Sequence, residues 1–168
     1  MSSEDINEII PYLFISNWNT SNNPNVIKKY NIKAVITLET IDKPKDIIDF
    51  YKNNNIDFMY IKLYDDPNSD ISKYFDTTYN FIDSHIKQKK NVLVHCMAGI
   101  SRSTTIVLNY ILKKKYELNY IENPYTVVDD IINYVRTKRY IINPNSGFIK
   151  QLMIQSKKYY NEKKVGIY

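Results

Sequence analysis

The chain contains one cysteine, Cys96, among its 168 residues. An intrachain disulfide is therefore excluded, and no second thiol is present to trap an oxidised Cys96 within the chain. Proteins with so few thiols and no disulfide are typical of reducing compartments, so the sequence predicts a cytoplasmic location.

Long apolar runs are also missing. No stretch approaches the roughly 20 consecutive apolar residues that a membrane-spanning helix needs. The first ten residues, MSSEDINEII, are polar and acidic, whereas a signal peptide has a basic start and an apolar centre. We therefore expect no membrane segment and no secretion.

Arginine and histidine are scarce. The net charge is +5, yet the only arginines are Arg102, Arg136 and Arg139. Most of the excess comes from lysines at expected helix ends and in the tail, which is typical of a solvated surface and argues against a nucleic-acid partner. The two histidines, His85 and His95, do not have the spacing of a metal site. We expect no metal and no other cofactor.

Apolar runs and helical stripes alternate along the chain. Strands are expected at 9–16, 34–38, 58–63 and 91–95, and helices at 24–30, 44–53, 71–88, 102–115, 124–138 and 145–160. Asn23 and Asp70 have the character of helix N-caps, and the Asn-rich residues 17–25 favour a loop. The alternation predicts an α/β fold in which a central, mostly parallel sheet of four to five strands is flanked by helices. We expect a single domain over residues 1–168, with its core at about 9–158 and a frayed tail at 161–168.

Residues 91–105, NVLVHCMAGISRSTT, combine a buried strand, a short loop and a helix start. Cys96 follows the strand, and five residues separate it from Arg102. A loop of this length that ends at a helix N-terminus can turn successive N–H groups inward to form an anion-binding cup. Gly99 suits a loop conformation that other residues avoid. The same amides and the helix dipole would stabilise a thiolate at the base of the cup.

Each of these residues also has an ordinary interpretation. Cys96 alone fits a buried structural cysteine, and a cup with a thiol fits a redox site as well as a phosphate site. Arg102 as a surface residue would place a cation at the positive end of a helix, which is unfavourable unless an anion binds there. Asp65 and Asp66 follow strand 58–63 and fit solvated loop carboxylates. The carboxyl ends of parallel strands share one sheet edge, so Asp65 and Cys96 can also face one crevice.

The segment His95-Cys96-Met97-Ala98-Gly99-Ile100-Ser101-Arg102-Ser103 matches the His-Cys-five residues-Arg-Ser/Thr signature of cysteine-based protein phosphatases. The chain most closely resembles small dual-specificity phosphatases of the protein tyrosine phosphatase superfamily. Residues 12–16, Asp65, residues 70–72 and residues 139–145 agree with the same family, so the resemblance covers about residues 9–155. The stretch 116–125 is longer than the usual helix connection of the family.

The resemblance implies a role for each residue of the signature. Cys96 is the nucleophile that forms a phosphocysteine, and Asp65 is the general acid, with Asp66 as the alternative. Ser103 stabilises the leaving thiolate, and His95 orients the loop by hydrogen bonding. Phosphate binding falls to Arg102 and to the backbone amides of Met97, Ala98, Gly99, Ile100, Ser101 and Arg102. For Asn145 the sequence favours a helix cap over a contact with the site.

The expected function is therefore hydrolysis of phosphotyrosine and of phosphoserine or phosphothreonine in phosphorylated protein substrates. The variable loop positions carry no basic residue, unlike those of inositol-lipid phosphatases, and Ser101 stands where RNA 5′-phosphatases commonly have Asn. Both remain as alternatives on the same fold. A third alternative is a catalytically inactive phosphate-recognition module.

Overall fold

A five-stranded sheet forms the centre of the molecule in the computed structural model, which describes residues 4–118 and 121–167. The strands are β1 (Ile6–Ile10), β2 (Leu13–Ser16), β3 (Ile32–Glu39), β4 (Asp57–Lys62) and β5 (Asn91–His95). Their order is β1-β2-β5-β3-β4, and only the β1–β2 pair is antiparallel. The predicted α/β class with a mostly parallel sheet is confirmed.

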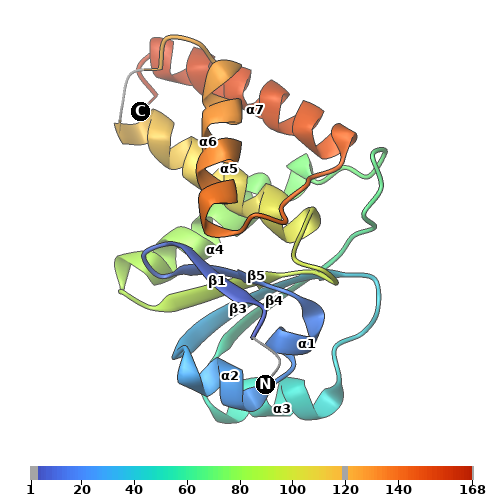
Figure 1. The fold of residues 1–168 in the computed structure, drawn as a ribbon. Coiled ribbons are helices and arrows are strands. Elements are labelled where there is room, and N and C mark those ends of the chain that lie inside the picture. Colours follow the sequence, from blue (N-terminus) through green and yellow to red (C-terminus); the bar gives the residue numbers. More distant parts are fainter. Residues whose placement is uncertain (1–3, 119–120, 168) are drawn as a thin grey trace.

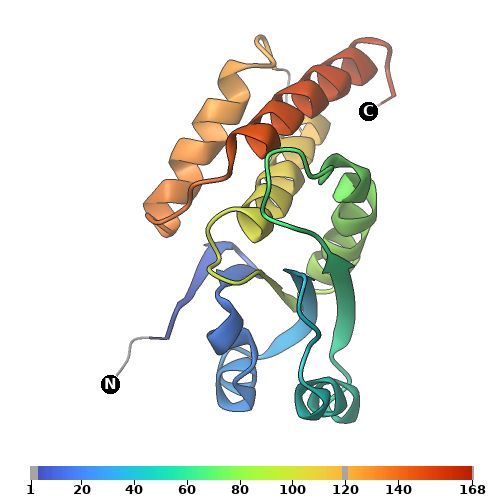
Figure 2. The same ribbon diagram turned by 90° about the vertical axis from the view of Figure 1, so that its right-hand side faces the viewer.

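Helices cover both faces of this sheet (Figure 1). They are α1 (Trp18–Ser21), α2 (Pro24–Lys29), α3 (Lys45–Asn53), α4 (Phe75–Lys87), α5 (Arg102–Leu118), α6 (Thr126–Lys138) and α7 (Ser146–Lys164), with a 3-10 turn at Ser72–Tyr74. Figures 1 and 2 show α4 to α7 on one side of the sheet and α2 and α3 on the other.

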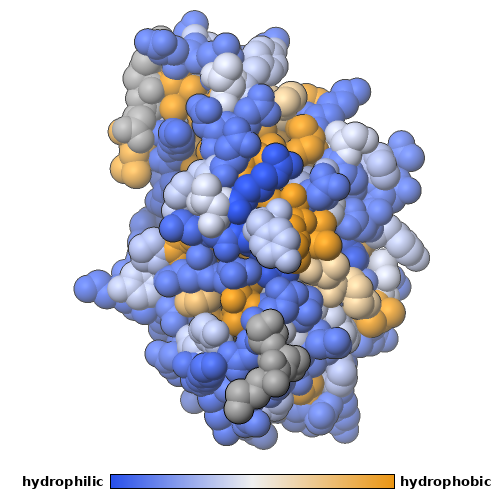
Figure 3. All heavy atoms as spheres, in the orientation of Figure 1, coloured by the Kyte–Doolittle hydropathy of each residue, from blue (hydrophilic) through white to orange (hydrophobic). Residues whose placement is uncertain are grey.

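Two apolar cores result from this arrangement. In β5, Val92 and Val94 pack into the core beneath α4 to α7, whereas Leu93 packs into the core beneath α2 and α3. Because both faces of the strand are covered, its sequence is a continuous apolar run and does not alternate with polar residues. Hydrophilic side chains cover most of the face shown in Figure 3, as expected when apolar side chains fill the two cores.

The first predicted strand is wrong in its extent. Residues 9–16 do not form one strand, because the chain turns at Pro11 and Tyr12 and separates β1 from β2. Tyr12 has φ 70°, and its N–H donates to the Glu8 carboxylate at 3.0 Å. The apolar pattern runs through this turn without a break, so periodicity did not reveal it.

Three other features differ from the prediction. The expected loop at 17–25 contains helix α1, where the Asn17 side chain accepts from the Thr20 N–H at 2.8 Å. Strand β4 lies at the edge of the sheet, so it is only partly buried and not a buried strand as predicted. Helix α7 continues to Lys164, past the point at which the frayed tail was expected to begin. The two residues 119–120 of the long connection lie outside the described residues.

One of the two predicted N-caps is confirmed. The Asn23 side chain accepts from the Asn25 N–H at 3.0 Å at the start of α2. The prediction for Asp70 is wrong, because α4 begins at Phe75 with Tyr74 as its N-cap, and Ile71 is the N-cap of the 3-10 turn before it. The Asp70 carboxylate instead accepts from the Ser72 hydroxyl at 2.7 Å and from the Lys73 N–H at 3.3 Å within that turn.

Candidate active site

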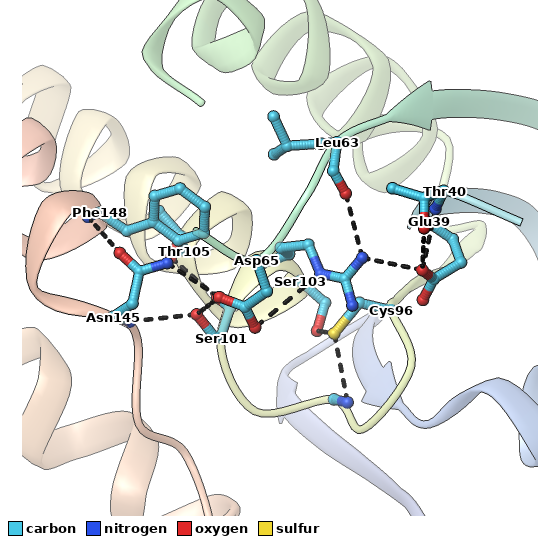
Figure 4. Close-up of polar contacts among 12 residues, drawn as sticks. Glu39, Thr40, Leu63, Asp65, Cys96, Ser101, Ser103, Thr105, Asn145 and Phe148 are labelled. Carbon is cyan, nitrogen blue, oxygen red and sulfur yellow. Dashed lines mark hydrogen bonds and ion pairs between the residues drawn. The ribbon is translucent and has the colours of Figure 1, made fainter. Parts of the chain in front are cut away.

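Cys96 lies where β5 ends and the loop to α5 begins (Figure 4). Its residue is only 1% exposed, so the thiol lies at the bottom of the loop. The Gly99 N–H donates to Sγ at 3.3 Å, and the Ser103 hydroxyl lies 3.3 Å from Sγ. One backbone donor and one hydroxyl thus contact the sulfur.

The backbone carbonyls of the loop that follows Cys96 accept hydrogen bonds from residues outside the loop. The Met97 carbonyl accepts from the Trp18 N–H at 3.0 Å, and the Ile100 carbonyl accepts from the Asn143 N–H at 2.9 Å. Arg139 donates from Nη2 to the Ala98 carbonyl at 3.2 Å and from Nε to the Gly99 carbonyl at 2.8 Å. In a trans peptide the next N–H points opposite to the carbonyl. Carbonyls held outward therefore turn the following amides toward the interior of the loop.

Gly99 has φ 66° and a backbone that leaves no space for a side chain. A Cβ at this position would lie 2.6 Å from the Ser16 carbonyl oxygen and 2.7 Å from Nη2 of Arg139. Arg139 and the end of β2 therefore press against the loop from outside at the point where Gly99 turns. This close approach explains why a glycine stands in the middle of the segment.

We expect Gly99→Ala to destabilise the fold by about 1–3 kcal/mol, because it adds both left-handed backbone strain and a clash with Ser16. Gly166→Ala is the matched control, since Gly166 also has positive φ but, among the described residues beyond its chain neighbours, no atom lies within 4 Å of an added Cβ. It should cost about 1 kcal/mol from strain alone. Urea unfolding of both variants measures the difference, and equal losses would contradict the packing role of Gly99.

Arg102 is buried and paired with a carboxylate. Its Nη1 donates to the Glu39 carboxylate and to the Leu63 carbonyl, at 3.0 and 3.1 Å (Figure 4). The two side chains are 8% and 4% exposed. Within the described residues, Nε of Arg102 has no hydrogen-bond partner, although the Asp65 carboxylate lies 3.9 Å away. The ordinary interpretation of Arg102 as a surface residue is therefore wrong.

Asp65 reaches the loop from the segment after β4. Its Oδ1 accepts from the Ser101 hydroxyl at 2.7 Å and from the Asn145 side-chain amide at 2.8 Å (Figure 4). Asp66 instead accepts from the Asn68 N–H at 2.7 Å within its own exposed loop. The structure thus brings Asp65 to the edge of the loop that holds Cys96 and directs Asp66 into a local turn.

Asn145 both caps α7 and contacts the site. Its Oδ1 accepts from the Phe148 N–H at 3.0 Å, and its side-chain amide donates to Asp65. The predicted cap is therefore confirmed, and the contact with the site, which the sequence made the less favoured alternative, is present as well. Gly147 allows the Asp65 loop to lie this close, because a Cβ there would be 1.8 Å from the Pro67 carbonyl oxygen.

His95 is fully buried behind the loop. Its Nδ1 lies 3.3 Å from the Cys96 carbonyl and 3.2 Å from the Ser21 hydroxyl. Its Nε2 lies 2.6 Å from the Thr37 hydroxyl and 2.8 Å from Nζ of Lys43. Burial, followed by the positive charge of Lys43, holds the pKa of His95 well below its ordinary value. The imidazole is therefore neutral and available to orient the loop.

Three residues around the loop were missed by the sequence reasoning: Glu39, Lys43 and Arg139. Glu39 directly follows the predicted strand 34–38, and this position at the carboxyl end of a strand was a usable signal. Lys43 gave no local signal, because a lysine between turn residues is ordinarily exposed. Arg139 lies in the segment 139–145 that agrees with the family, but the sequence gave no sign of a contact with the loop.

The described residues contain no group of three or more His, Cys, Asp or Glu side chains that could hold a metal ion. Among the helices described, none combines the length and the apolar character that crossing a membrane requires.

The sequence matches the catalytic domain of dual specificity phosphatases over residues 13–158. It is 31% identical over 140 residues to dual specificity protein phosphatase 1 of Arabidopsis thaliana, covering 83% of this chain and 63% of that protein. It is 35% identical over 149 residues to dual specificity protein phosphatase 1B of the same plant, covering 89% of this chain and 80% of that protein.

A similar solved structure is the Yvh1 phosphatase domain from Chaetomium thermophilum, with a TM-score of 0.77 and 27% sequence identity. The match covers 91% of this chain and 96% of that domain. Several relatives are longer proteins, and the chain spans less than two thirds of the first Arabidopsis phosphatase. The extent of the family match and the agreement in fold lead to one conclusion. The chain belongs to the dual specificity phosphatase catalytic domain family of the cysteine-based protein tyrosine phosphatases, which are phosphoric monoester hydrolases.

Proposed function

We propose that this chain is a protein phosphatase that hydrolyses phosphotyrosine and phosphoserine or phosphothreonine through a phosphocysteine intermediate on Cys96. The observation that carries the proposal is the convergence of four groups on one loop. The Cys96 thiol lies at the bottom of the loop, and carbonyls that point outward turn the loop amides inward. The buried guanidinium belongs to Arg102, the first residue of α5, and the Asp65 carboxylate contacts the edge of the loop. This set supplies a nucleophile, an anion cup and an acid.

In the first step, the Cys96 thiolate attacks phosphorus as the bond to the leaving oxygen breaks. The amides of Met97, Ala98, Gly99, Ile100, Ser101 and Arg102 and the guanidinium of Arg102 bind the phosphoryl oxygens. Nε of Arg102 is a buried donor without a partner among the described residues, and a phosphoryl oxygen would accept its hydrogen bond. Asp65 gives a proton to the leaving oxygen, so that an alcohol or phenol departs in place of an anion.

In the second step, water attacks the phosphocysteine and the thiolate departs. Asp65, now ionised, accepts a proton from this water. The Ser103 hydroxyl, 3.3 Å from Sγ, donates to the thiolate as negative charge returns to it. His95 supports both steps by holding the carbonyl of Cys96 from behind the loop.

The choice of phosphoprotein as substrate depends on the loop side chains. Met97 and Ala98 are exposed and uncharged, and Ser101 is already bonded to Asp65. None of them supplies the extra positive charge that an inositol phosphate or a 5′-triphosphate end would favour. These two substrate classes and an inactive phosphate-recognition module remain the competing functions.

Asp65→Asn should lower kcat by about 10²–10⁴-fold, because the amide cannot protonate the leaving oxygen. The loss should shrink for aryl phosphates with acidic phenol leaving groups, which depart without a proton. Asp66→Asn is the matched control and should stay within about twofold of wild type, as for an exposed loop residue. Steady-state assays with a series of aryl phosphates measure both effects. A larger loss in the Asp66 variant would reverse the assignment.

The substrate class is tested on one preparation of the protein. Initial rates are compared for phosphotyrosine and phosphothreonine peptides, an inositol phosphate and triphosphate-ended RNA. We expect the peptides to be hydrolysed fastest. Faster release from the RNA or the inositol phosphate would replace the protein substrate, and tight peptide binding without turnover would favour the recognition module.

We also propose that residues 1–168 act as one catalytic domain in the cytoplasm. The free thiol at Cys96 supports a reducing compartment, because the nucleophile must remain reduced. The core beneath α4 to α7 uses residues from β1 to α7, and the core beneath α2 and α3 uses residues from β1 to β5. Both cores share the central sheet, which supports a single unit.

A further inference from the structure

Lys43 is a buried lysine behind the phosphate-binding loop. It follows β3, is 5% exposed, and places Nζ 2.8 Å from Nε2 of His95 and 3.1 Å from the Ser21 hydroxyl. Nζ also lies over the ring of Trp18, 4.8 Å from its centroid. Residues from β5 and α1 therefore enclose the amine, and the Tyr51 ring of α3 completes the enclosure at 5.7 Å.

No carboxylate balances this amine. In residues 4–118 and 121–167, none of the ion pairs involves Lys43. Of the two acids in the same segment, Glu39 is bound to Arg102, and the side chain of Asp42 is exposed. A buried, unpaired cation is costly, so its presence beside the histidine that precedes the candidate nucleophile calls for a role.

The hydrogen-bond partners of His95 indicate which ring nitrogen carries the proton. The Ser21 hydroxyl donates to the Trp18 carbonyl at 2.8 Å, so its oxygen is an acceptor toward Nδ1. The other neighbour of Nδ1 is the Cys96 carbonyl, which only accepts. On the opposite side, an ammonium at Lys43 only donates. The geometry therefore requires a proton on Nδ1 and a lone pair on Nε2.

We propose that Lys43 is a positioning residue for Cys96, which acts by donating to Nε2 of His95 and so keeping the Nδ1–H directed at the Cys96 carbonyl. This inference rests on the proposed function, in which Cys96 is the nucleophile. The Lys43 ammonium polarises the imidazole and strengthens the hydrogen bond that holds the first carbonyl of the loop. The Thr37 hydroxyl also reaches Nε2, as a weaker, neutral donor.

The interaction is expected to depend on pH. Burial lowers the pKa of Lys43 from 10.5 to about 7. His95 beside it is neutral, and the positive charge of the nearby Arg102 also disfavours protonation of His95. The nearest carboxylates of this segment are Glu39, which is bound to Arg102, and the exposed Asp42. Below pH 7 the ammonium donates to Nε2, and above pH 7 a neutral amine donates more weakly. The strengthened bond is therefore present at low pH and is lost as pH rises through about 7.

Nitrogen-15 NMR of the imidazole rings tests the proposal directly and needs no turnover. The chain has only two histidines, so labelled histidine gives two rings, and His85→Gln assigns them. In wild type we expect Nδ1 of His95 to be protonated, and the Nε2 signal to titrate with a midpoint near pH 7. In Lys43→Met that titration should vanish. A proton on Nε2 in wild type, or identical Nε2 titrations in the two proteins, would overturn the proposal.

Two further variants separate Lys43 from other causes. Lys45→Met removes an exposed lysine two residues away and should leave the Nε2 titration of His95 unchanged. Lys43→Gln keeps a neutral donor, so it should retain the Nδ1–H without the titration near pH 7. If Lys43→Met does not fold, this glutamine variant still gives a result, because a titration that persists in it would exclude Lys43 as the source.

The activity readout is the ratio of wild-type to Lys43→Met kcat at each pH. We expect about fivefold at pH 6, the size of one hydrogen bond, falling toward one by pH 8.5. The ratio for Lys45→Met should stay near one throughout. A ratio that does not change with pH would indicate a structural role only. If neither wild type nor the Lys45 control turns over an aryl phosphate, the proposed function fails, whereas the NMR result still stands.

Discussion

Cys96→Ser should reduce turnover of an aryl phosphate by at least about 10⁴-fold, because removing a covalent nucleophile leaves only binding and electrostatic effects. A serine hydroxyl is a far weaker nucleophile than the thiolate that attacks in the proposed mechanism. The substitution replaces one atom at a position that is 1% exposed, so the loop around it should be preserved. Rapid-quench experiments with a labelled substrate should detect a phosphoenzyme in wild type and none in the variant.

The control for this prediction is binding. Inward amides and Arg102 do not depend on sulfur, so Cys96→Ser should retain affinity for a phosphopeptide within about tenfold of wild type. Calorimetry with the phosphopeptide measures this affinity. If turnover persisted in the variant, another residue would be the nucleophile. If binding were lost as well, the serine would have collapsed the cup, and the kinetic result would say nothing about nucleophilic attack.

Arg102→Lys should lower kcat by about 10³-fold or more, the range expected when an arginine that stabilises phosphoryl transfer is lost. Lysine keeps the charge but loses the planar pair of donors that can bind two phosphoryl oxygens. It also loses a fixed position, because Arg102 is held through Nη1 by Glu39 and the Leu63 carbonyl. Steady-state kinetics on an aryl phosphate measure the loss. An Arg102→Lys variant with near-normal kcat would show that the amides alone stabilise the transferring group.

Glu39→Gln distinguishes the role of Glu39 in holding the Arg102 guanidinium from the contribution of the guanidinium to catalysis. The amide oxygen of glutamine still accepts from Nη1, but the buried negative charge next to the phosphate site is removed. We therefore expect a much smaller loss of kcat than in Arg102→Lys. Thermal unfolding of both variants is the control. If their stabilities are equal, the difference in kcat does not come from a loss of folded protein.

The pattern of apolar residues predicted most of the fold, because burial on both faces of a parallel sheet leaves continuous apolar strands. The run Val92 to Val94 is an example, and it became β5 as expected. The pattern failed where local geometry decided the outcome. The apolar run across Pro11 and Tyr12 looked continuous, yet the positive φ of Tyr12 reverses the chain there. Strand β4 was expected to be buried because an apolar sequence does not reveal whether a strand has one neighbour or two.

The residues of the candidate site also fall into two groups, those that the local sequence identified and those that only the tertiary structure placed. Spacing along the chain identified Cys96, Gly99 and Arg102, because a loop between a strand and a helix N-terminus is a local structure. The ambiguity between Asp65 and Asp66 was not local. Adjacent carboxylates have the same chemistry, and only the tertiary structure turns one toward Ser101 and Asn145 and the other into its own loop.

By itself, therefore, the sequence determined that this protein carries a thiol in a short loop between a strand and a helix N-terminus, because consecutive residues build both the loop and the helix that follows it. The tertiary structure decided what surrounds the loop. Glu39, Lys43 and Arg139 come from distant segments and are buried against it. In a linear sequence, Lys43 and Arg139 look like surface charges, and only the packing of the fold buries them, so that each then needs a hydrogen-bond partner.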